Sequence, residues 1–127
     1  MDIYINNPIQ INIDTLELDE YLPSLNLKTI VCIEKENYSL KIELISWFEC
    51  SVFSSFIVDL QNYKVAVFKN INNNFRLEID IENKSMYWFL SKEDLHGNIS
   101  KTEGNEIICI DDRDNILNAF KAYPKWW

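Results

Sequence analysis

Apolar and charged residues alternate most regularly between residues 75 and 82. Phenylalanine, leucine and isoleucine occupy every second position, and arginine, glutamate and aspartate stand between them. Because successive side chains of a β-strand point to opposite faces of a sheet, this period of two predicts a strand with one buried and one solvated face. The solvated face would carry a row of three acids, Glu78, Asp80 and Glu82.

The N-terminal third of the chain shows the same alternation. Isoleucines at every second position around Pro8 predict a strand that is interrupted by a turn or bulge, and the acidic segment 14–20 is expected to prolong it. Residues 29–35 and 38–45 predict a β-hairpin, because only two residues separate two apolar, alternating segments.

Residues 64–69 and 86–90 flank the clearest strand, and short turn segments lie between them, so we expect a three-stranded meander. The polar segment 91–106 contains both glycines of the chain and predicts an exposed, mobile loop. A further strand is expected at 106–110.

The segment 47–63 has apolar residues at helical spacing, which predicts a central amphipathic helix over about residues 51–62. A strand remains the alternative, because several of the same residues are β-formers. Ser51 is a candidate N-cap for the helix. The residues at helical spacing are Phe53, Phe56, Ile57 and Leu60.

A second helix is predicted over about residues 112–122, with Asp111 or Asp112 as its N-cap and Pro124 beyond its end. The chain of 127 residues fits a single α+β domain, 1–127. We expect antiparallel sheet structure of about six to eight strands, with one central and one C-terminal helix.

The charge balance narrows the classes of partner. Twenty acids oppose twelve bases, for a net charge of −8. Phosphate backbones require clustered Lys and Arg, so direct nucleic-acid binding is not expected. An acidic surface attracts basic partners, although the charge could equally serve solubility alone. With no apolar run long enough for a membrane span and no secretion signal, the sequence predicts a cytoplasmic protein without a membrane partner.

Residues that carry chemistry are sparse. His96 is the only histidine, and the three cysteines form no C-x-x-C motif. No phosphate-binding, hydrolase or metalloprotease motif is present. We therefore expect no catalytic residues, no metal and no cofactor, and a protein that is not an enzyme.

Three groups are candidates for partner binding. The acidic row could meet basic side chains, although an ordinary solvated face explains it as well. The acids at 111, 112 and 114 fit a helix cap better than a cation site. The C-terminal tryptophans could anchor an interface or pack on the core. The candidates are Glu78, Asp80, Glu82, Asp111, Asp112, Asp114, Trp126 and Trp127.

The order of elements and two spaced patterns resemble a known class of protein, the small cytosolic immunity proteins that protect bacteria against polymorphic or contact-dependent toxins. The resemblance covers most of the chain. Its two patterns are Phe53-x-x-Phe56-x-x-Asp59-Leu60-x-x-Tyr63 and Asp111-x-x-x-x-Ile116-x-x-x-Phe120-x-x-Tyr123-Pro124.

This resemblance implies a single-domain inhibitor that binds a cognate protein toxin and blocks its activity by occlusion. The negative charge favours a basic toxin, such as a nuclease. An acidic nucleic-acid mimic that inhibits a DNA-binding enzyme is one alternative, and a small ligand-binding or enzymatic domain is another. If the acidic row is not the interface, the segments 14–20 and 91–106 are the next candidates.

Overall fold

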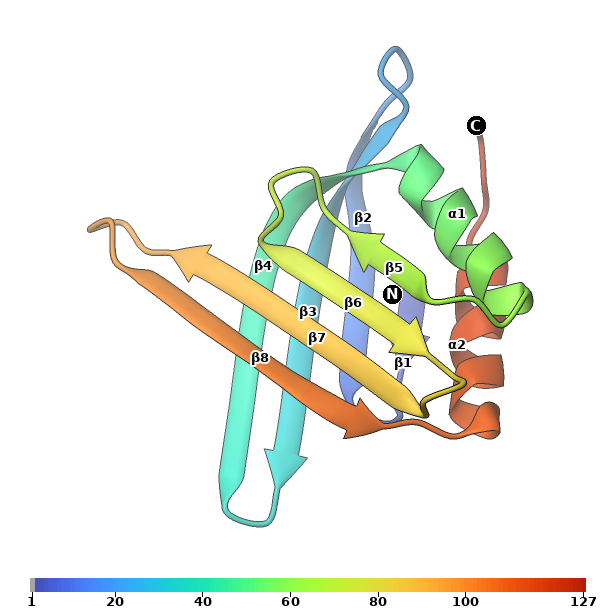
Figure 1. The fold of residues 1–127 in the computed structure, drawn as a ribbon. Helices are drawn as coiled ribbons and strands as arrows, with labels where there is room; N and C mark the ends of the chain where they lie inside the picture. Colours follow the sequence, from blue (N-terminus) through green and yellow to red (C-terminus); the bar gives the residue numbers. More distant parts are fainter. Residues whose placement is uncertain (1) are drawn as a thin grey trace.

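The fold consists of two antiparallel sheets of four strands each and two helices (Figure 1). A computed structural model describes residues 2–127. The first sheet has the strand order β1-β2-β3-β4. Its strands are β1 (Ile3–Ile5), β2 (Gln10–Asp19), β3 (Ser24–Lys35) and β4 (Tyr38–Glu49).

The second sheet has the order β5-β6-β7-β8, and each helix follows one sheet in the chain. Its strands are β5 (Ala66–Lys69), β6 (Phe75–Asp80), β7 (Ser85–Glu93) and β8 (Ile99–Ile107). The helices are α1 (Cys50–Gln61) and α2 (Ile110–Lys121).

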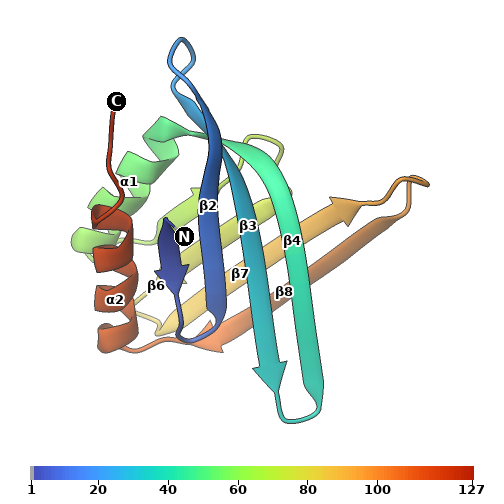
Figure 2. The ribbon, with the colours of Figure 1, turned by 180° about the vertical axis from the view of Figure 1, so that it is seen from behind.

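The two sheets face each other, and their strands cross at a steep angle (Figures 1 and 2). Both helices lie beside the edges formed by β1 and β5, where α1 packs on β5 and α2 on β1. In each sheet, consecutive strands pair antiparallel to one another. Such a sheet can bury one face in the core and leave the other in solvent. Each sheet covers the buried face of the other, and the helices close one side.

One hydrophobic core contains residues from both sheets and both helices. Its centre is aromatic: Phe68 of β5 stacks on Phe48 of β4 with ring centroids 4.7 Å apart, and Phe120 of α2 lies 5.0 Å from Phe68. These rings are fully buried, so they exclude water between the sheets and the helices.

Two lysines connect the sheets on the side opposite the helices. Lys92 of β7 donates to the backbone carbonyl of Glu43 in β4 at 2.8 Å. Lys35 of β3 pairs with Glu106 of β8, whose side chain is only 8% exposed. The charged ends of these long side chains therefore help to close the side of the core that no helix covers.

The structure confirms the α+β class, the antiparallel pairing and both helices, but the eight strands form two sheets rather than one. The alternation in β6 is confirmed, since Phe75, Leu77 and Ile79 are buried. The hairpin of β3 and β4 and the meander of β5, β6 and β7 are also confirmed.

The segment 47–63 is not one element. Trp47, Phe48 and Glu49 end strand β4, and the helix begins at Cys50. The predicted Ser51 cap is wrong, because the N-cap is Glu49 and no side chain caps α1. Strand pairing with β3 extends to Glu49, so the ladder hydrogen bonds outweigh the helical pattern there.

The predicted loop over 91–106 is also wrong. Residues 99–107 form β8, which pairs with β7 over its whole length, and the turn is confined to residues 94–98. The predicted strand at 106–110 correspondingly ends at Ile107. An edge strand pairs through its backbone and needs few apolar side chains, so its sequence does not show the usual alternation.

Gly104 in β8 is a position where the structure admits no larger residue. The indole of Trp88, its neighbour across the strands, lies flat over it, so an added Cβ would stand 2.6 Å from the Trp88 ring. Trp88 is 4% exposed and cannot move into solvent without opening the core.

We expect Gly104→Ala to lower the free energy of unfolding by about 1–3 kcal/mol, because the ring or the strand must shift. Urea denaturation measures the change. Ser100→Ala on the exposed part of the same strand is the control and should stay within about 0.5 kcal/mol of the wild type. A Gly104→Ala protein as stable as this control would contradict the close approach of the Trp88 ring.

None of the helices among residues 2–127 is both long enough and apolar enough to cross a membrane.

Candidate functional site

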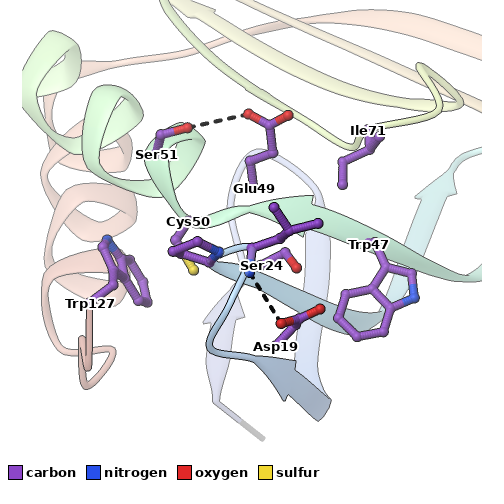
Figure 3. A pocket seen from close by; sticks show the side chains of 10 residues that line it. Asp19, Ser24, Trp47, Glu49, Cys50, Ser51, Ile71 and Trp127 are labelled. Carbon is purple, nitrogen blue, oxygen red and sulfur yellow. Dashed lines mark hydrogen bonds between the residues drawn. The ribbon is translucent and has the colours of Figure 1, made fainter.

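A cavity of about 610 Å³ lies at the end of the first sheet (Figure 3). We call it the end cavity. Strands β2, β3 and β4, the first turn of α1, the loop between β5 and β6, and the C-terminal residue all contribute to it. It therefore collects side chains from segments that are far apart in the sequence.

Strand register places two acids on either side of the cavity floor. Asp19 of β2 is paired with Ser24 of β3, and Ser24 is paired with Glu49 of β4. Neighbouring strands are about 4.8 Å apart, so the Cα atoms of Asp19 and Glu49 lie about 10 Å apart across the three strands. No Lys, Arg or His is among the described residues that line the cavity, so its charge is negative.

Each acid is held by a local hydrogen bond. The Asp19 Oδ1 atom accepts from the backbone N–H groups of Tyr21 at 2.9 Å and Leu22 at 3.2 Å, which shapes the turn between β2 and β3. The Glu49 carboxylate accepts from the Ser51 hydroxyl at 3.4 Å. These contacts fix the positions of the acids but do not neutralise their charge.

Apolar side chains form the rest of the wall. Trp47 and Trp127 lie on opposite sides of the cavity, with the two acids between them (Figure 3). The backbone N–H of Ile71 donates to the Trp47 carbonyl at 2.9 Å, which anchors the loop between β5 and β6 beside β4. The Trp127 indole N–H donates to the Ser54 hydroxyl at 3.1 Å, which ties the C-terminus to α1.

The cavity continues into an exposed apolar surface on the turn between β2 and β3, which projects from the molecule (Figure 1). Tyr21 is 96% exposed, and Leu22, which also lines the cavity, is 76% exposed. Contiguous exposed apolar side chains next to a cavity are typical of interaction sites.

Cys50 is the cysteine that lines the cavity. Only 1% of it is exposed, and burial raises the pKa of its thiol. A thiolate nucleophile needs the opposite, a lowered pKa and access to solvent. The Cys50 thiol therefore lacks both features of an activated nucleophile.

We expect Cys50 to react with a thiol reagent on the order of a hundredfold or more slowly than the exposed Cys109, because its labelling requires local opening of the fold. Timed labelling of the native protein, read by peptide mass spectrometry, gives both rates. Cys109→Ser is the control, since serine suits an N-cap position. Equal labelling rates for the two cysteines would contradict the buried position of Cys50.

Of the predicted acidic row, only Glu78 and Asp80 lie on strand β6. Glu78 accepts two hydrogen bonds from Arg76, at 2.9 and 3.1 Å. Asp80 accepts from the backbone and side chain of Asn83, and Glu82 lies in the turn after β6 rather than on the strand. Two of the three carboxylates thus have local partners, and whether the row binds another protein stays a prediction.

The acids at the start of α2 have structural roles. Cys109 is the N-cap, which corrects the expectation of Asp111 or Asp112. Asp112 closes a capping box by accepting from the Cys109 backbone N–H at 3.3 Å, and Asp111 lies in the first turn, where a negative charge is favoured. Asp114 pairs with Arg113 at 2.6 Å.

Arg113 joins the two helices. Its guanidinium is buried and donates to the backbone carbonyls of Leu60, at 2.6 and 3.1 Å, and Gln61, at 3.2 Å, at the end of α1. Its guanidinium carbon lies 4.3 Å from the centre of the Tyr63 ring. Arg113 thus satisfies the last carbonyls of a helix that has no basic residue in its own last turn.

The two C-terminal tryptophans differ. Trp127 packs on the core, with its ring centre 5.8 Å from that of Phe53, whereas Trp126 is 38% exposed. Trp127 is the only one of the eight predicted binding residues that lines the end cavity. Asp19 belongs to the segment 14–20 that was the second choice for an interface.

Trp47, Glu49 and Ile71 were not predicted as site residues. A signal for the first two exists in the sequence, because the alternation of β4 continues through Trp47 and Glu49 on the outer face. No sequence signal points to Ile71, which reaches the cavity only through the packing of the two sheets.

The outer face of β3 and β4 carries a salt bridge between two side chains that do not line the cavity. Lys28 pairs with Glu43 at 2.9 Å, which raises the pKa of Lys28 and lowers that of Glu43.

Among residues 2–127, no group of three or more His, Cys, Asp or Glu side chains is placed to hold a metal ion.

Comparisons with protein-family models, curated proteins and solved structures found no match to this chain.

Proposed function

We propose that this chain is a toxin-neutralising immunity protein, a non-enzymatic protein that binds a basic toxin domain and blocks its activity by occlusion. The observation that carries the proposal is the end cavity with its surroundings. It combines two aromatic walls, two acids and an exposed apolar turn on one end of the molecule.

This combination suits a protein partner better than a small polar substrate. Interfaces are enriched in Trp and Tyr at their centre, and the energetically important residues lie in pockets with a polar rim. Tyr21 and Leu22 extend the apolar surface beyond the cavity, so a partner could cover both at once.

Charge supports the basic nature of the partner. The net charge is −8, and the acids of the turn between β2 and β3 lie next to the cavity. Such a field speeds the encounter with a basic protein and raises the association rate at low salt. Occlusion follows if the bound surface includes the active site of the toxin.

Coexpression tests the proposal. The probe is any toxin-like C-terminal domain that a neighbouring gene encodes, and cell growth is the readout. Wild-type protein should restore growth. The double variant Asp19→Asn, Glu49→Gln keeps the shape of both side chains and one acceptor oxygen on each but removes two charges, and it should protect less well.

The double variant Glu34→Gln, Glu36→Gln is the matched control, since it removes two exposed carboxylates at the end of β3 opposite to Ser24 and should protect as the wild type does. Failure of the wild-type protein to restore growth with any toxin encoded beside it, together with no complex in gel filtration, would refute the immunity function.

A further inference from the structure

The end cavity has the features of a subsite for one cationic side chain. Trp47 lies two residues before Glu49 on β4, so the two side chains share the outer face of the sheet about 7 Å apart along the strand. Asp19 and Glu49 flank the same space from β2 and β4 (Figure 3).

The walls and the charges place different demands on a ligand. Trp47, Ile71 and Trp127 favour an apolar or planar group, because burying polar atoms against them without a partner is costly. The two carboxylates favour a positive charge that can donate several hydrogen bonds. A long side chain with an apolar stem and a charged end meets both demands.

We propose that the end cavity binds an arginine side chain presented by an extended segment of a basic protein partner. The guanidinium would stack on the Trp47 indole and donate to Asp19 or Glu49. The inference rests on the proposed function, since it names the group of the toxin that the cavity takes.

Arginine fits better than lysine for two physical reasons. Its planar guanidinium stacks on an indole, and its donors form a fork that matches a carboxylate. The cavity of about 610 Å³ exceeds the volume of one side chain, so it also has room for part of the neighbouring segment.

A small probe tests the subsite without a toxin. N-acetyl-arginine methylamide is titrated into the protein while the indole N–H signals are followed by NMR. The chain has four tryptophans, and the signals of Trp47 and Trp127 should shift, whereas Trp88, which is 4% exposed, is an internal control. N-acetyl-citrulline methylamide, the neutral analogue of the same shape, should bind about tenfold or more weakly, since it lacks the charge.

The double variant Asp19→Asn, Glu49→Gln should lose that preference for arginine, and the control variant Glu34→Gln, Glu36→Gln should keep it. Equal binding of both probes to the wild-type protein, or no shift at Trp47, would overturn the arginine subsite. Coexpression with a toxin is a separate measurement. If the protein neutralises a toxin but does not bind the arginine probe, the arginine subsite is refuted and the proposed immunity function is not.

Discussion

Replacing Phe68 with alanine should remove about 3–5 kcal/mol from the free energy of unfolding. The side chain is fully buried, and its ring centre lies within 6.1 Å of those of five other phenylalanines. Its loss leaves a cavity where both sheets and both helices meet. Domains of this size are stable by about 5–15 kcal/mol, so the loss is a large fraction of the total stability.

Urea denaturation followed by tryptophan fluorescence measures the effect. Phe89→Ala is the control, because this ring lies half-buried on the outer face of the second sheet. It should cost much less than Phe68→Ala. Similar losses in the two variants would mean that the aromatic cluster is not the centre of the core.

Arg113→Ala should cost about 2–4 kcal/mol, because it removes the guanidinium donors to the buried Leu60 carbonyl and to the part-buried Gln61 carbonyl at the end of α1. It also removes the contact of the guanidinium with Tyr63. Arg113→Lys should recover part of the loss, since lysine keeps the charge but not the fork of donors.

Lys121→Ala, at the exposed end of the same helix, controls for the loss of a positive charge and should change stability by about 0.5 kcal/mol or less. Thermal unfolding monitored by circular dichroism compares all three variants. An Arg113→Ala protein as stable as Lys121→Ala would show that the end of α1 does not depend on this side chain.

Both helices and most strands could be predicted from the sequence, because their burial follows a regular period. Phe53, Phe56, Ile57 and Leu60 are all buried on one face of α1, as their spacing indicates. In β6 the residues at every second position are buried, and those between them are partly exposed, as the period of two predicts. Such patterns arise wherever one side of an element meets the core.

Strand β8 could not be predicted in the same way. It lies at the edge of its sheet, its side chains are mostly exposed, and it is held by backbone bonds to β7 and by the contact of Trp88 with Gly104. The division into two sheets was also hidden, because nothing in a strand's own pattern says which strands will be its neighbours.

The end cavity depends on contacts between segments that are far apart in the sequence. Trp47 and Trp127 are 80 positions apart and reach the same cavity only because the C-terminus returns along α1 (Figure 1). The sequence pointed to acids and to terminal tryptophans separately. It could not show that Asp19 and Glu49 flank one space, since this follows from the register of three strands.

Association of this protein with a toxin-like domain that a neighbouring gene encodes would test the central claim most directly. Surface plasmon resonance at two salt concentrations would compare three proteins. They are the wild type, an end-cavity variant with Asp19→Asn and Glu49→Gln, and an acidic-row variant with Glu78→Gln, Asp80→Asn and Glu82→Gln. We expect tight binding that weakens with salt, an affinity loss of about tenfold or more in the end-cavity variant, and a much smaller loss in the acidic-row variant. Binding that the end-cavity variant leaves unchanged, or the absence of binding by the wild type, would contradict the account.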